Sequence, residues 1–181
     1  SKLNADSWAL YFMDTAKLSK HWQVFGGIRY DHFDIDNTGF NYRDNTVNET
    51  VAYDKGFVNG HAGVTYKPAE NISVYGSVST SSNLPGEMYD GVSSVDYGGL
   101  IAGMDDIKPE QNVNFEVGTK WEVAGGDLLM SAAVYQMDKS NKVENAAGRR
   151  EPAELSQSGE MQVQGIELSA SGKITPKLSV A

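Results

Sequence analysis

The feature that most constrains this chain is a long, repeated alternation of apolar and polar residues. It is clearest in the segment 113–123, where every second residue is apolar or threonine and the residues between them are polar, charged or glycine. The same pattern recurs in the segments 22–31, 58–67 and 72–80. Because successive side chains of a β-strand point to opposite faces, a period of two over this length predicts strands.

Less regular segments complete the set of expected strands. The segments 8–18 and 128–139 have apolar residues in both phases. The segment 162–175 changes phase near Gly165, so we expect a β-bulge or a bend at that glycine. With these segments the chain holds seven full strands, and the residues 178–181 form the beginning of an eighth.

Short and long connections alternate between these strands. The short turns are expected at 19–21, 68–71, 125–127 and 175–177. The long polar connections are expected at about 37–55, 84–111 and 143–160. A soluble β-sandwich usually has strands of about 5–6 residues, whereas these run to about twice that length. The fold class predicted is therefore all-β, an antiparallel transmembrane β-barrel segment with short periplasmic turns and long extracellular loops.

Composition is consistent with this architecture and excludes several others. Lys and Arg number 15 against 24 Asp and Glu, which gives a net charge of −9 and argues against a nucleic-acid partner. The chain has no cysteine, which excludes disulfides, thiolate zinc sites and a cysteine nucleophile. A mean hydropathy of −0.41 is typical of a soluble protein. We interpret it instead as the average of an apolar face and a polar face.

The alternation assigns residues to each face of the barrel wall. The inner face is expected to hold charged residues, which a wide, hydrated lumen accommodates: Arg29, Lys67, Glu116, Lys120, Glu122, Glu167 and Lys173. Aromatic residues near the strand ends match the girdles of membrane barrels: Trp8, Trp22, Tyr30, Tyr66 and Trp121.

No catalytic or metal-binding constellation is evident, and we expect neither enzymatic activity nor a cofactor. The three histidines, His21, His32 and His61, lie in different strands or turns, and His61 is expected to face the lumen. Asp105, Asp106 and Glu110 offer oxygen ligands for calcium, but without the spacing of a defined site. A solvated acidic loop is the preferred interpretation of these three residues.

Four segments resemble a known family when they are taken in order. They are FGGIRYDHFDID (25–36), YKPAENISVYGSVSTSSNLPGE (66–87), IKPEQNVNFEVGTKWE (107–122) and VQGIELSASGKITPKLSV (163–180). Together they resemble the barrel domain of TonB-dependent outer-membrane receptors, in particular the ferric-siderophore receptors, including those for catecholates. The combination of Lys-Pro-Glu, Glu-x-Gly-x-Lys-Trp and Gly-Ile-Glu-Leu is more specific than any one of them.

The resemblance implies a 22-stranded barrel, of which this chain would supply about eight strands, with an N-terminal plug. Residues 1–181 are then expected to be a partial barrel domain that contains neither the plug nor the remaining strands, since the sequence looks cut at both ends. The implied partners are a ferric siderophore, the TonB energy-transducing complex acting through the plug, and the lipid and lipopolysaccharide around a multi-pass barrel. The implied location is the outer membrane of a Gram-negative bacterium.

The long connections hold the candidate ligand-binding residues. A ferric siderophore is bulky and often anionic, so guanidinium groups and aromatic faces suit it, and iron arrives already chelated. The candidates are Tyr42, Arg43, Tyr89, Tyr97, Arg149 and Arg150. Two alternatives stay open: the adjacent Arg149 and Arg150 pair with nearby glutamates or with lipopolysaccharide phosphates, and the tyrosines pack within the loops.

Other functions also stay open at this point. A TonB-dependent receptor for haem, cobalamin or a glycan is one, although the long connections lack the histidine that haem capture commonly uses. A passive porin or structural outer-membrane barrel is a second. A soluble β-sandwich that binds a ligand is a third.

Overall fold

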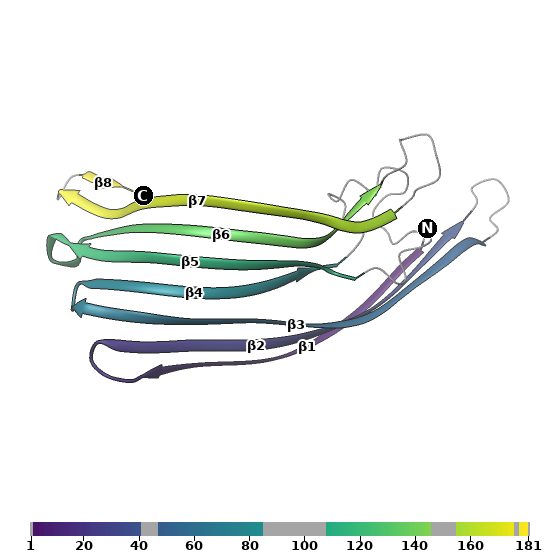
Figure 1. Cartoon of the computed structure of the whole chain (residues 1–181), viewed down its shortest axis with the longest axis horizontal. Coiled ribbons are helices and arrows are strands. Elements are labelled where there is room, and N and C mark those ends of the chain that lie inside the picture. Colours follow the sequence, from purple (N-terminus) through teal and green to yellow (C-terminus); the bar gives the residue numbers. More distant parts are fainter. Residues whose placement is uncertain (1, 41–46, 85–107, 146–154, 176–177, 181) are drawn as a thin grey trace.

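The computed structural model describes residues 2–40, 47–84, 108–145, 155–175 and 178–180. They form one antiparallel sheet of eight strands in the order β1 to β8, so that each strand pairs only with its neighbours in sequence (Figure 1). The strands are β1 (Lys2–Lys17), β2 (Trp22–Phe40), β3 (Val47–Ala69), β4 (Ile72–Asn83), β5 (Glu110–Val123), β6 (Leu128–Asn145), β7 (Leu155–Thr175) and β8 (Leu178–Val180). This confirms the predicted seven full strands and the beginning of an eighth.

Tight connections join β1 to β2, β3 to β4 and β5 to β6 at one end of the sheet, as predicted (Figure 1). Residues 176–177 of the fourth predicted turn lie outside the described residues. Between β1 and β2, the Ser19 hydroxyl accepts the backbone N–H groups of His21 and Trp22, at 3.2 and 3.1 Å. Between β5 and β6, a single 3-10 turn (η1, Ala124–Gly126) has positive φ at all three residues, a conformation that its two glycines adopt without strain. No helix in the described part of the chain is long and apolar enough to cross a membrane.

At the opposite end of the sheet, two hairpins extend further than the sequence predicts. β2 runs to Phe40 and β3 begins at Val47, so most of the connection expected at 37–55 is paired strand. Likewise β6 reaches Asn145 and β7 begins at Leu155, inside the connection expected at 143–160. The predicted limits are wrong because backbone pairing continues through polar residues that show no hydrophobic alternation.

The bulge expected at Gly165 is also absent from the structure. The β6–β7 pairing is continuous from Leu128–Gly172 to Lys139–Met161, and the register shifts only beyond Lys139. Gly165 lies directly opposite Tyr135, and a Cβ atom built on Gly165 would be 2.5 Å from the phenol oxygen of that tyrosine. The glycine therefore makes room for an aromatic side chain on the neighbouring strand.

The sheet divides between β3 and β4. Their pairing extends from Ala69–Ile72 to His61–Ser79, where the regular ladder ends. The next contact uses a side chain, because Thr80 Oγ1 accepts the N–H of Gly60 at 2.9 Å and donates to the carbonyl of Gly60 at 3.4 Å. Beyond this point β3 stays paired with β2, and β4 with β5.

Candidate functional site: the two faces of the sheet

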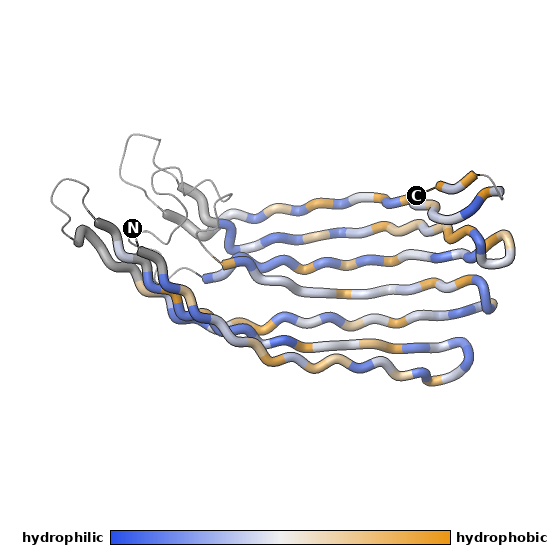
Figure 2. The backbone as a smooth tube through the Cα atoms, turned by 180° about the vertical axis from the view of Figure 1, so that it is seen from behind, coloured by the Kyte–Doolittle hydropathy of each residue, from blue (hydrophilic) through white to orange (hydrophobic). Residues whose placement is uncertain are grey.

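One face of the sheet is apolar and is not covered by the described chain. We call it the apolar belt, and its main members are Leu10, Phe12, Val24, Ile28, Val58, Val64, Val74, Val78, Phe115, Val117, Val134, Ile166 and Leu168. Many of these side chains are largely exposed, among them Leu168 at 79% and Ile166 at 74%. Figure 2 shows the resulting alternation of hydrophobic and hydrophilic residues along the strands. An apolar surface of this extent needs an apolar environment.

Aromatic pairs mark both ends of the apolar belt. Trp22 and Tyr66 lie beside the turns with their ring centroids 4.7 Å apart, and Trp8 and Tyr30 lie at the other end, 5.2 Å apart. Along β2 the belt is about nine residues high, which matches the ~9–11 residues that a transmembrane strand needs. The register also places Trp121 on this face, opposite Met130, so all five predicted girdle residues share the apolar face.

A polar network limits the belt on β6 and β7. Directly beyond the belt on the same face, Asp138 accepts hydrogen bonds from the amides of Gln136, at 2.8 Å, and Gln162, at 2.7 Å. Gln164 in turn donates to Gln136 at 2.8 Å. The two amide donors hold the pKa of Asp138 below its usual value, because they stabilise the carboxylate. A carboxylate held charged in this way belongs in water, outside the membrane-spanning segment.

The opposite face, which we call the polar face, holds the charged residues predicted for the lumen. The continuous register of β2 to β7 places Arg29, Glu116, Lys120 and Glu167 together on it. His61 lies on this face too, as predicted. Opposite polarity on the two faces of one sheet is the arrangement of a barrel wall that separates lipid from a hydrated lumen.

Side chains of the polar face are organised by specific contacts around Tyr75. The phenol of Tyr75 donates a hydrogen bond to Glu116 Oε1 at 2.5 Å, and Lys120 Nζ lies 5.5 Å from the centroid of the tyrosine ring. Gly118 leaves the space that the ring occupies, since a Cβ atom there would be 2.5 Å from the phenol oxygen. A polar pocket of 370 Å³ lies over this cluster and extends to Phe25.

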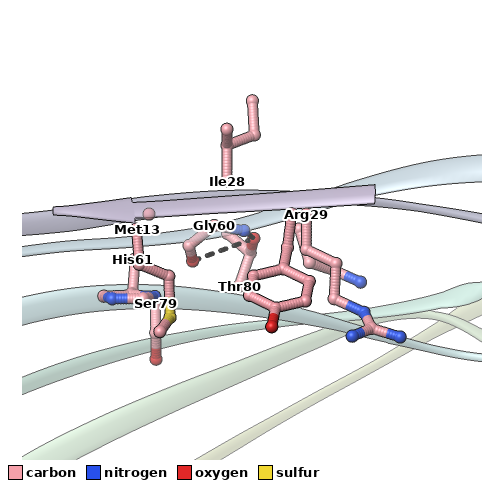
Figure 3. Close-up of a pocket in the computed structure, with 10 residues that line it drawn as sticks. Met13, Ile28, Arg29, Gly60, His61, Ser79 and Thr80 are labelled. Atoms are coloured by element: carbon pink, nitrogen blue, oxygen red, sulfur yellow. Dashed lines mark hydrogen bonds between the residues drawn. The ribbon is translucent and has the colours of Figure 1, made fainter. Parts of the chain in front are cut away.

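A second pocket, of 450 Å³, lies where β3 and β4 part. It is lined by Tyr11, Met13, Gly27, Ile28, Arg29, Asn59, Gly60, His61, Ser79 and Thr80. Figure 3 shows Met13, Arg29, His61 and Ser79 on one side of the sheet and Ile28 on the other. Arg29 Nε donates to both carboxylate oxygens of the largely buried Asp31, at 2.8 and 2.9 Å, so the guanidinium charge is neutralised locally.

The residues predicted to bind ligand are not placed by the structure. Tyr42, Arg43, Tyr89, Tyr97, Arg149 and Arg150 all lie outside the described residues, and so do Asp105 and Asp106. Glu110 is described, and the expectation of a solvated loop is wrong for it. It is the first residue of β5, is 1% exposed and forms an ion pair with Lys139. The physical reason is the extension of β5 and β6, which brings two opposite charges together at their paired ends.

Sequence reasoning also missed an aromatic group beyond the belt on the polar face. Phe33 and Phe57 stack with their centroids 5.5 Å apart. Four residues before Phe57 on β3, and opposite Ile35 on β2, Tyr53 is completely buried, although the sequence placed it in a loop. Burial raises the pKa of Tyr53 to about 12. The sequence did indicate this, because Tyr53 and Phe57 are an even number of positions apart and would therefore share one face of a strand.

Metal-binding clusters of the common kind are not seen in the described ranges. Within them, no group of three or more histidine, aspartate or glutamate side chains is placed to hold a metal ion. What the described surface offers is a polar wall with two pockets, backed by an apolar belt.

Comparison with known proteins agrees with this architecture. Residues 1–180 match the family model described as "TonB dependent receptor-like, beta-barrel". The chain is 31% identical to the probable TonB-dependent receptor BfrD of Bordetella pertussis, over 99% of this chain and 23% of BfrD. It is 30% identical to the catecholate siderophore receptor Fiu of Escherichia coli K12, over 97% of this chain and 25% of Fiu.

A solved structure gives the same result. The siderophore receptor PiuA from Acinetobacter baumannii superposes with a TM-score of 0.83 at 28% identity, over 98% of this chain and 24% of PiuA. The chain thus spans about a quarter of the length of the relatives that it matches.

Proposed function

The chain belongs to the TonB-dependent receptor β-barrel family, and from this membership we propose that it forms part of the barrel wall of an outer-membrane receptor that takes up ferric siderophores. The observation that supports this most directly is the division of one sheet into an exposed apolar belt and a polar face. A receptor barrel needs both, because its outer surface contacts lipid while its inner surface contacts water and ligand.

The substrate class follows from the relatives. Fiu is named as a catecholate siderophore receptor and PiuA as a siderophore receptor, and both match nearly the whole chain. A siderophore delivers iron already chelated, so the receptor binds the complex and needs neither a resident metal nor a cofactor. The protein acts as a transport receptor and not as an enzyme.

Ligand contact is proposed for the connections between strands. Arg149 and Arg150 offer guanidinium donors to an anionic complex, with Arg43 as a third. Tyr42, Tyr89 and Tyr97 offer aromatic faces. The supporting observation is the polarity at that end of the sheet, where the apolar belt gives way to the Gln136–Asp138–Gln162 network.

Energy is proposed to come from the TonB complex, acting through a plug domain elsewhere in the full-length receptor. The belt then lies in the outer membrane of a Gram-negative bacterium, against lipid and lipopolysaccharide. The aromatic pairs Trp22–Tyr66 and Trp8–Tyr30 support this placement, because aromatic rings are enriched at both membrane interfaces.

Deletion of the full-length gene tests the proposal. Cells are grown under iron restriction on a panel of catecholate and hydroxamate siderophores, and uptake of radioactive iron is measured for each. Loss of uptake for at least one siderophore, with the same loss in a TonB-deficient strain, is expected. If iron uptake is unchanged and uptake of haem, cobalamin or a glycan is lost, the substrate is that nutrient and not a ferric siderophore. TonB-independent diffusion of small solutes would instead indicate a porin.

The binding residues are tested separately in the intact receptor. The double variant Arg149→Ala/Arg150→Ala is expected to weaken siderophore binding while assembly in the membrane stays normal. Lys20→Ala, in the β1–β2 turn at the other end of the sheet, is the matched control for loss of a cation. Equal affinity of the double variant and the control would exclude the arginine pair from the binding site.

A further inference from the structure

The polar face brings a methionine and a histidine together across a glycine. Met13 on β1 pairs with Gly27 on β2, and Gly27 pairs with His61 on β3. The three residues form one row across three strands, with the side chains of Met13 and His61 on the same face of the sheet (Figure 3). Since Gly27 has no side chain, no side chain of β2 lies between Met13 and His61 in this row.

The space above Gly27 fixes how close these side chains are. A Cβ atom built on Gly27 would lie 2.7 Å from His61 Cε1 and 3.0 Å from Met13 Cγ. The two side-chain atoms are therefore less than about 6 Å apart. At zinc sites the bonds are ~2.0–2.1 Å to imidazole nitrogen and ~2.3 Å to sulfur, so a nitrogen and a sulfur that share one metal ion of similar bond lengths are about 4 Å apart. His61 Cε1 is bonded to both ring nitrogens and Met13 Sδ is bonded to Cγ, so the donor atoms lie next to the two atoms whose separation is bounded above, and rotation about the side-chain bonds sets their final distance.

Both donor groups are accessible and uncommitted. Met13 is 63% exposed, and both residues line the 450 Å³ pocket. Among the described residues, His61 makes no hydrogen bond or ion pair, and its nearest aromatic contact is Phe25, with the ring centroids 6.1 Å apart. By contrast, His21 has its Nδ1 2.7 Å from the carbonyl of Lys67, and His32 lies 3.4 Å from Asp54.

We propose that Met13 and His61 form a binding site for a soft monovalent cation, Cu(I) or Ag(I). Thioether sulfur selects soft metal ions, and imidazole binds copper readily. Two neutral donors do not compensate the hydration of a hard divalent ion, which requires carboxylate and carbonyl oxygens. The carboxylate near this row, Asp31, is occupied by Arg29, so the site lacks the ligands that Ca²⁺ or Mg²⁺ prefers.

Titration of the purified full-length receptor with Ag(I) tests the site without any redox step. Calorimetry in a thiol-free nitrate buffer is expected to show a tight site that is lost in Met13→Leu and in His61→Gln. Each variant is expected to weaken Ag(I) binding by at least about tenfold. Loss of a residue that only hydrogen-bonds to a metal ligand commonly has an effect of this size, and loss of a ligand itself should have no smaller one. Both side chains are solvent-accessible, so these variants retain the fold.

Matched controls come from the same sheet. Met137 lies on the same face and in the same cross-strand row, three strands beyond His61, so Met137→Leu should leave Ag(I) affinity unchanged. His21→Gln removes an imidazole in a turn and should also have no effect. A loss of affinity in these controls equal to that in Met13→Leu would show non-specific binding and overturn the site.

Two further measurements complete the test. X-ray absorption of the loaded receptor should show both nitrogen and sulfur neighbours of the metal, and a shell of oxygen alone would contradict the assignment. Gly27→Ala should weaken binding as well, because its methyl group occupies the space between the donors. Ag(I) binding is measured by calorimetry and siderophore transport by iron uptake, so failure of the metal site leaves the proposed transport function intact.

Discussion

Along β5, Glu116 and Val117 are neighbours in the chain but lie on opposite faces of the sheet, and different forces position them. Val117 is 56% exposed, and its cross-strand partners are Gly76 on β4 and Val134 on β6. Glu116 accepts a hydrogen bond from Tyr75 at a defined distance. The apolar belt thus requires only that its residues are hydrophobic, whereas the polar face requires specific pairs of side chains that form hydrogen bonds. Substitutions should therefore act differently on the two faces.

Insertion of a charge into the apolar belt is expected to have the largest effect. Val117→Arg places a guanidinium in hydrocarbon and should lower the free energy of unfolding by about 2–4 kcal/mol. Asn114→Arg, on the same strand but on the polar face, should change it by less than about 0.5 kcal/mol. Guanidinium unfolding of the receptor in lipid vesicles measures both. Similar values for the two variants would mean that the faces are assigned wrongly.

Filling the space beneath Tyr75 should have the next largest effect. In Gly118→Ala the added methyl group overlaps the tyrosine ring, which must move away from Glu116, at a cost of about 1–3 kcal/mol. Gly76→Ala is the matched change in the apolar belt, where the nearest atom to a new Cβ is 3.9 Å away. This control should be almost neutral in the same unfolding assay. The comparison fails if Gly76→Ala is the more damaging variant.

Removal of one hydroxyl from the polar face should have a smaller effect. Tyr75→Phe loses the hydrogen bond to Glu116 and should destabilise the receptor by about 1 kcal/mol. Tyr135→Phe removes the same atom from a tyrosine whose ring also lies over a glycine. Because the described residues offer Tyr135 no hydrogen bond, its variant should match the wild type. Equal losses would show that removal of the hydroxyl group, and not loss of the hydrogen bond to Glu116, lowers the stability.

The smallest effect is expected at the border of the belt, and it depends on pH. The pKa of Asp138 is lowered in the folded protein by Gln136 and Gln162. Its contribution to stability is therefore complete above the unfolded pKa of about 3.9 and is lost as pH falls through the folded pKa. Gln162→Leu should move the folded pKa upward, as measured by NMR titration of the carboxyl carbon. Gln111→Leu, outside the network, should leave it unchanged.

The belt was predictable because alternation in a segment such as 113–123 is a local property of the sequence. Each apolar residue of that segment lies on one face, and Trp121 lies at the expected border. Strand pairing near the ends of the strands was not predictable in this way. The hairpin of β2 and β3 continues through polar residues to Phe40, where no hydrophobic pattern indicates it.

Some features depend on partners distant in sequence and therefore could not be inferred locally. A glycine within a strand is compatible with a bulge or with space for an aromatic ring, and only the register with Tyr135 distinguishes these at Gly165. The ion pair of Glu110 and Lys139 likewise depends on how far two strands extend. The proposed ligand residues, such as Arg149, remain predictions because they lie outside the described residues.

The strictly sequential strand order has a consequence for how the wall is assembled. Since each strand pairs only with the strands before and after it in the chain, no strand has to enter between two that are already joined. Every contact that a new hairpin needs is present as soon as the preceding hairpin is in place. The sheet can therefore grow at one edge by successive addition, and its contacts stay short in sequence, which lowers the entropy lost in closing each loop.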